Sequence, residues 1–290
     1  GSAPLCAGGA MTLTNAGNLR CVNMTVSGVT STVSNNTVQN INFTTTNATQ
    51  FNGCLLLGQG SFMCNGNTVG SQTANSNIVV SMSGSGAAFN GIIFGGSSPT
   101  LLSTISNNTV GGIDFIVTGA PATIPFIRGI SVQGTTVGHN YIVTNNTVGS
   151  PTVLNSINSN SNTAGSVIGI VSFSNALDQQ ITNNTIANLT ATNTGTANVM
   201  WGILAQGTSN VGTFQVTGNT VRNLTSTSGA TGSGGAASIM GFSAIVNLST
   251  LGTNNISNNT FHSFINNNTT AAASVTGMNI SHPAGVTTNF

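Results

Sequence analysis

Seven copies of a four-residue motif, Asn-Asn-Thr-Val or a close variant of it, recur along this chain at a nearly constant interval. The second residue of the motif falls at Asn36, Asn67, Asn108, Asn146, Asn184, Asn219 and Asn259, giving successive spacings of 31, 41, 38, 38, 35 and 40 residues. A second marker, Gly followed by an apolar residue, keeps the same step. It occurs at Gly53, Gly91, Gly129, Gly169, Gly202, Gly241 and Gly277, and the first six copies lie 14 to 18 residues ahead of an Asn motif. A repeat of this length predicts stacked supersecondary units rather than a globule with one central core.

The segments that flank each motif have the pattern of strands. Apolar and small polar residues alternate in Tyr141–Thr144 and Phe214–Thr217, and a period of two that is rich in β-branched residues favours β-structure. The 37 glycines are too many for helical repeats. We therefore predict an all-β fold, a parallel β-solenoid of about seven units of about 38 residues each.

The repeat sets the expected domain organisation. Residues 33–290 are assigned to the solenoid, and residues 1–32 to an N-terminal segment that is either a first coil or a cap. Each unit has two possible constructions, a single coil with a protruding loop or two coils of about 19 residues. The stretch ahead of each Gly marker varies most in length, which favours the single coil with a loop.

The Asn pair has the chemistry of a corner between strands. Asn tolerates the left-handed backbone conformation, and Gly, which adopts it freely, replaces the first Asn at Gly66 and Gly218. Coils that stack at about 4.8 Å place equivalent Asn side chains in a column, where their amides can hydrogen-bond to the next coil. The second Asn of all seven motifs is therefore predicted to form a structural ladder.

These motifs carry a family resemblance. The segment Ile181–Leu189, Ile-Thr-Asn-Asn-Thr-Ile-Ala-Asn-Leu, resembles the right-handed parallel β-helix repeat of pectate-lyase-like proteins. In particular it is similar to the charge-poor, Asn/Thr-rich arrays of large secreted bacterial surface proteins. The resemblance implies a right-handed β-helix over about nine-tenths of the chain. It does not imply one function, because this fold hosts enzymes, adhesins and structural modules.

Charged residues are nearly absent. The chain has three Arg and two Asp, with no Lys or Glu, so it lacks the basic clusters that bind nucleic acid or anionic membranes. The chain has no run of about 20 apolar residues, which a membrane-spanning helix would require. The 38% of hydrophobic residues recur at regular positions, which argues against disorder.

Catalytic constellations are not expected either. Glycoside hydrolysis needs two carboxylates within about 10 Å, but Asp114 and Asp178 lie at different offsets from their Asn markers and two units apart. None of His139, His262 and His282 has an acid in register, and no nucleophile elbow occurs. We predict no enzyme activity, no cofactor and no metal site. The only Trp, Trp201, is interpreted as a packing residue, with a sugar-stacking platform as the alternative.

The four cysteines all lie in the first quarter of the chain, at Cys6, Cys21, Cys54 and Cys64. An even number in a chain of this composition predicts two disulfides and an extracellular or cell-surface location. The preferred pairs are Cys6–Cys21 and Cys54–Cys64, and the alternative is Cys21–Cys54. The spacings do not match a zinc site. No leader is recognisable, and the many Asn glycosylation sequons favour a prokaryotic source.

The ends of the array suggest a function. A solenoid exposes unpaired backbone at both ends unless a cap covers them, and no capping helix is predicted at residues 1–31. The last unit has Gly277 and Met278 but no Asn motif, and its short tail stays apolar, with Ile280 and Phe290. We predict an extracellular structural subunit whose partner is itself, stacked end to end into a filament. The alternatives are a segment of a large cell-surface adhesin or stalk, and a β-helix that binds glycan or ice.

Overall fold

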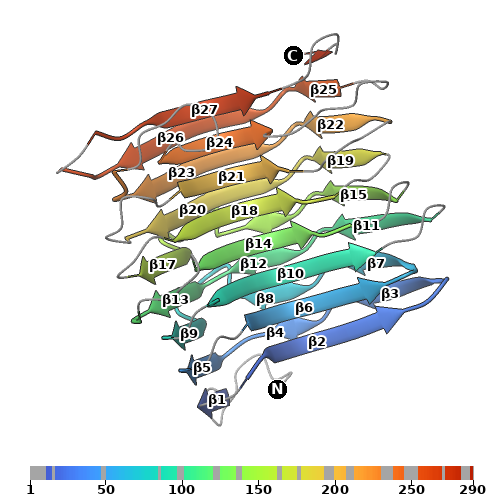
Figure 1. Cartoon of the computed structure of the whole chain (residues 1–290), viewed down its shortest axis with the longest axis horizontal. Coiled ribbons are helices and arrows are strands. Elements are labelled where there is room, and N and C mark those ends of the chain that lie inside the picture. The colour runs from blue at the N-terminus through green and yellow to red at the C-terminus, as the bar shows by residue number, and fades with distance from the viewer. Residues whose placement is uncertain are drawn as a thin grey trace.

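The structure is a computed structural model, and it describes residues 11–14, 17–46, 50–83, 86–96, 101–119, 125–134, 139–161, 165–174, 178–192, 199–206, 212–229, 238–244, 254–269, 272–281 and 288–289. These residues form an all-β parallel solenoid and contain no helix. Every pair of neighbouring strands is parallel, as the repeat predicted. The coils stack from the N-terminal end, blue in Figure 1, to the C-terminal end in red.

Each coil crosses three sheets in turn. Sheet 1 contains β2 (Leu19–Val26), β6 (Gln50–Gly58), β10 (Ala88–Gly96), β14 (Phe126–Val132), β18 (Ser166–Ser172), β21 (Val199–Ala205), β24 (Ile239–Ala244) and β27 (Val275–Ile280). Sheet 2 contains β3 (Thr30–Ser34), β7 (Ser61–Asn65), β11 (Leu102–Ser106), β15 (Asn140–Thr144), β19 (Gln179–Thr182), β22 (Phe214–Thr217), β25 (Asn254–Ser257) and β28 (Thr288–Asn289).

Sheet 3 closes the coil. It contains β1 (Met11–Thr14), β4 (Thr37–Val38), β5 (Ile41–Thr45), β8 (Thr68–Gly70), β9 (Ile78–Met82), β12 (Thr109–Gly111), β13 (Ile113–Val117), β16 (Thr147–Val148), β17 (Ile157–Ser161), β20 (Thr185–Ala191), β23 (Thr220–Ser226) and β26 (Thr260–Asn266). The early coils cross this sheet in two short strands, whereas β20, β23 and β26 each cross it as one strand.

One repeat makes one coil. Asn52 pairs with Asn90 and Thr109 pairs with Thr147, so residues one unit apart in sequence are neighbours in space. This confirms the single-coil alternative. Strands β1, β2 and β3 already belong to the three sheets, so the described residues before Val33 are part of the solenoid. A boundary at residue 33 would fall inside β3.

The core explains why the two sequence markers keep step. A Cβ added to Gly129 in sheet 1 would lie 2.3 Å from the Val148 side chain of sheet 3, and one added to Gly202 would lie 2.3 Å from that of Val221. The same contact joins Gly53 to Val69, Gly91 to Val110, Gly169 to Ile186 and Gly241 to Phe261. Each Gly marker therefore makes room for the apolar residue of the Asn motif in its own coil.

Two loops of similar length interrupt sheet 3, at residues 71–77 and 149–156. The coil between them turns at Gly112 alone, and the loops meet across it. The Asn75 side chain donates to the Leu154 carbonyl oxygen at 3.0 Å, and Ser150 Oγ donates to the Gln72 carbonyl oxygen at 2.7 Å. These contacts tie together coils that are not direct neighbours in the stack.

Candidate functional site

The second Asn of each motif stands in one continuous column at the corner between sheets 2 and 3. In every step the Nδ2 of one Asn donates to the Oδ1 of the next, at 2.9 to 3.0 Å, from Asn36 to Asn259. The backbone N–H of the same Asn donates to the same Oδ1, at 2.9 to 3.1 Å. The five inner members, Asn67, Asn108, Asn146, Asn184 and Asn219, are buried.

The second Nδ2 hydrogen ties each Asn from Asn67 to Asn259 back to the preceding coil. Asn146, for example, donates to the Ile105 carbonyl oxygen at 2.9 Å, and Asn259 donates to the Val216 carbonyl oxygen at 2.7 Å. The corner therefore satisfies its buried polar groups with amides and carbonyls alone, without charge.

The ladder has a direction, so its two ends differ. Each Oδ1 accepts from the coil before it, and each backbone N–H donates to the coil after it. Among the described residues, nothing donates to Asn36 Oδ1 and nothing accepts from the Asn259 backbone N–H. Both side chains are half-buried. One end of the column presents an acceptor and the other end presents a donor.

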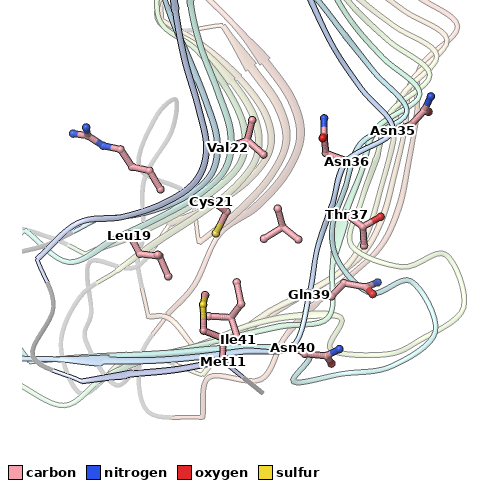
Figure 2. Close-up of a pocket in the computed structure, with 12 residues that line it drawn as sticks. Met11, Leu19, Cys21, Val22, Asn35, Asn36, Thr37, Gln39, Asn40 and Ile41 are labelled. Atoms are coloured by element: carbon pink, nitrogen blue, oxygen red, sulfur yellow. The ribbon is translucent and has the colours of Figure 1, made fainter. Parts of the chain in front are cut away.

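The N-terminal end of the described stack is hollow. A cavity of about 630 Å³ opens there between the first strands of the solenoid. Figure 2 shows Leu19, Cys21, Val22 and Ile41 around it. Asn36 also lines this cavity, so the acceptor end of the ladder lies beside apolar side chains that no further described coil covers.

The C-terminal end carries the matching surface. Of the predicted assembly residues, Gly277 and Met278 lie in β27, which among the described strands pairs only with β24. Met278 is 40% exposed although it continues a buried column. Ile280 packs against the core, and Phe290 lies outside the described residues. A Cβ added to Gly277 would meet nothing within 4 Å, whereas at Gly241 it would meet the Gly277 carbonyl oxygen at 2.4 Å. At each earlier marker the next coil's glycine carbonyl oxygen occupies the space beside the glycine, and at Gly277 this space is open.

The disulfide prediction is not supported. Cys21, Cys54 and Cys64 are free thiols, so neither Cys54–Cys64 nor Cys21–Cys54 forms, and Cys6 lies outside the described residues. The side chains face the apolar core, where close packing already joins the coils. Burial raises the pKa of Cys21 to about 11 and that of Cys54 to about 12, and it raises the pKa of Cys64 further. These thiols are poor nucleophiles at neutral pH.

The two carboxylates lie at different places in the coil: Asp114 is in a strand of sheet 3, and Asp178 directly precedes β19 of sheet 2. Asp114 in β13 accepts from Ser76 Oγ and Asn158 Nδ2, and Asp178 accepts from the Thr213 backbone N–H at 2.7 Å. Both therefore hold loops or neighbouring strands. No group of three or more His, Cys, Asp or Glu residues that suits a metal occurs in the described part of the chain.

Two of the three histidines are described. His139 is buried beside Ser103, and His262 is exposed beside Ser263. His282 lies outside the described residues. Searched over those same ranges, the chain has no helix that could span a membrane.

The fold and ladder place the chain among parallel β-solenoids. In comparisons with known proteins, no family model, no curated protein and no solved structure matched it.

Proposed function

We propose that this protein is a structural subunit that stacks end to end into a filament through the two ends of its Asn ladder. The proposal rests on one observation: these two ends are complementary. Among the described residues, Asn36 Oδ1 is an unused acceptor at one end, and the Asn259 backbone N–H is an unused donor at the other. Placing one end on the other would continue the same hydrogen bonds that join the coils within a molecule.

Apolar surface supports the same contact. Leu19, Cys21 and Val22 border the hollow end, and Val275 and Met278 are 47% and 40% exposed at the opposite end. Covering such surface stabilises a contact by about 25 cal/mol for each Å² removed from water. Since the two surfaces are different, the contact is head to tail, and a head-to-tail contact that does not close forms a filament.

The near-absence of charge favours self-association. Three Arg and two Asp are distributed over the whole chain, so like subunits repel one another little. An extracellular surface fibre of a prokaryote, with a right-handed β-helix of the pectate-lyase-like type, is the setting that fits this composition and repeat.

A segment of a longer adhesin or stalk is the second candidate. The open space beside Gly277 would fit a further repeat of the same chain equally well. Intact-mass measurement of the native protein distinguishes the two proposals, because the stalk requires a parent chain much longer than 290 residues.

The filament proposal is tested with Met278→Lys and Met63→Lys. Met278 lies at the C-terminal end and Met63 lies on the side of the stack, at 40% and 50% exposure, so both monomers should tolerate the charge. We expect filaments in electron micrographs of the natural protein and of Met63→Lys, and discrete rods for Met278→Lys, because a Lys buried in the contact would lack a partner. Filaments of Met278→Lys, or rods for all three proteins, would contradict end-to-end stacking.

A further inference from the structure

A second apolar cluster lies on the outer face of sheet 1, separate from the solenoid core. It contains Ile168, Val171, Trp201, Leu204 and Met240, with Phe173 and Val199 packed against it. Arg128, Ile168, Trp201 and Met240 occupy equivalent positions in consecutive strands β14, β18, β21 and β24. One column of this face thus carries a cation beside apolar and aromatic side chains.

Arg128 is held there without a carboxylate. Its guanidinium carbon lies 3.8 Å from the centre of the Phe126 ring and 4.7 Å from that of Phe173. Its Nε is buried and has no hydrogen-bond partner among the described residues. Both acidic side chains of the chain, Asp114 and Asp178, are engaged elsewhere.

The Arg128 charge persists at neutral pH. Burial lowers the pKa of this guanidinium to about 10, so it stays protonated. Its neighbour in register, Asn90, also has an unpaired side-chain oxygen. A neutral amide oxygen can accept a hydrogen bond from a cation, but it cannot compensate the charge.

Trp201 supplies a second unused donor at the same place. The side chain is 9% exposed, and its Nε1 has no hydrogen-bond partner in the part of the chain that the structure describes. Trp201 and Arg128 line one open cavity of about 190 Å³. The other lining residues are the apolar Phe126, Ile168, Phe173 and Leu204 and the polar Ser166 and Gln206. A positive charge and aromatic side chains therefore border an open cavity, and two unused N–H groups lie buried in its walls.

We propose that this cavity binds a small monocarboxylate with an apolar body. The guanidinium of Arg128 lines the cavity without a carboxylate partner among the described residues, and it matches a carboxylate in charge and shape. The aromatic walls suit a hydrocarbon or aromatic body. A dianion would carry more charge than one guanidinium compensates.

The protein contains its own reporter for this site, because Trp201 is the only Trp in the chain. Phenylacetate is titrated against the natural protein while Trp fluorescence is followed, and phenylacetamide serves as the uncharged analogue of the same shape. We expect a saturable change with phenylacetate and at least about tenfold weaker binding of phenylacetamide, since the ionic hydrogen bonds are lost.

Two variants assign the effect to Arg128. Arg128→Met keeps the apolar stem and should weaken phenylacetate binding at least about tenfold. Arg222→Met is the matched control: Arg222 lies in sheet 3, where its Nη2 donates to the Pro151 carbonyl oxygen, and its loss should leave the titration unchanged. Circular dichroism confirms that both variants keep their β-structure.

Three results would overturn the proposal. They are the absence of a saturable fluorescence change at millimolar phenylacetate, equal binding of the acid and the amide, and equal weakening by both Arg variants. The comparison of acid with amide uses the natural protein, so it decides the matter even if Arg128→Met does not fold.

Discussion

The two residues of each Asn pair have different roles at the same corner. The first takes the left-handed backbone conformation, with φ of 55° at Asn145, and the Gly that replaces it at Gly66 and Gly218 has φ of 68°. The second is buried and forms the ladder, as at Asn146. The first position therefore requires a backbone conformation, and the second requires an amide.

This difference predicts opposite responses to substitution. Asn146→Ala would leave the Ile105 carbonyl oxygen and the Asn108 backbone N–H without their partners, and two buried unpaired groups should cost about 2 to 5 kcal/mol. Asn145→Gly keeps the left-handed turn and should change stability by less than about 1 kcal/mol. Urea denaturation followed by circular dichroism measures both effects. A similar loss in the two variants would show that the ladder amide has no special role.

At the scale of the strand, the Gly marker controls how closely sheet 1 approaches sheet 3. Within the stack, each marker glycine faces both an apolar side chain of its own coil and the carbonyl oxygen of the next coil's glycine. No side chain fits between them, so the close approach of sheet 1 to sheet 3 depends on this column. Gly277, in the last coil, has neither neighbour within 4 Å.

The glycine column offers a matched pair of substitutions. In Gly129→Ala the new Cβ would lie 2.3 Å from Val148 and 2.6 Å from the Gly169 carbonyl oxygen, and such overpacking should cost about 1 to 3 kcal/mol or more. Gly277→Ala meets nothing and should leave the unfolding of the single molecule unchanged within about 0.5 kcal/mol. Thermal unfolding of both variants measures the difference, and an unstable Gly277→Ala would contradict this account of the column.

For the whole molecule, stacking is an extension of the internal repeat. Hydrogen bonds between uncharged groups and apolar packing join the coils, and the same groups are presented at the two ends of the described stack. A filament built from them would have the cross-section of the molecule and little dependence on ion pairs.

This predicts that assembly is insensitive to salt. Raising the ionic strength from about 0.05 to about 1 M shortens the Debye length to about 3 Å, which would dissolve contacts that depend on exposed ion pairs. We expect the lowest protein concentration that forms filaments to change by less than about threefold, as measured by sedimentation and light scattering. Dissolution at high salt would show that charged groups, such as Arg20 beside the hollow end, hold the subunits together.

Local patterns were enough to predict the fold class and the unit length. Period-two alternation, the Asn pairs and the repeat spacing all report on chain geometry near each residue, and they indicated a parallel solenoid with one coil per unit. The disulfide prediction is not supported, because it depends on contacts between coils rather than on local geometry. Pairing depends on where side chains point in the stacked coils, and Cys21, Cys54 and Cys64 are free thiols that face the core.

The amino-acid sequence by itself determined that this chain stacks in units of about 38 residues, because an Asn motif at that interval sets both the turn and the repeating polar column. Only the tertiary structure decided that Gly129 makes room for Val148, that loops 71–77 and 149–156 meet over Gly112, and that Arg128 and Trp201 share a cavity. These contacts join different strands or coils, and which of them meet depends on how each coil bends and where each strand begins.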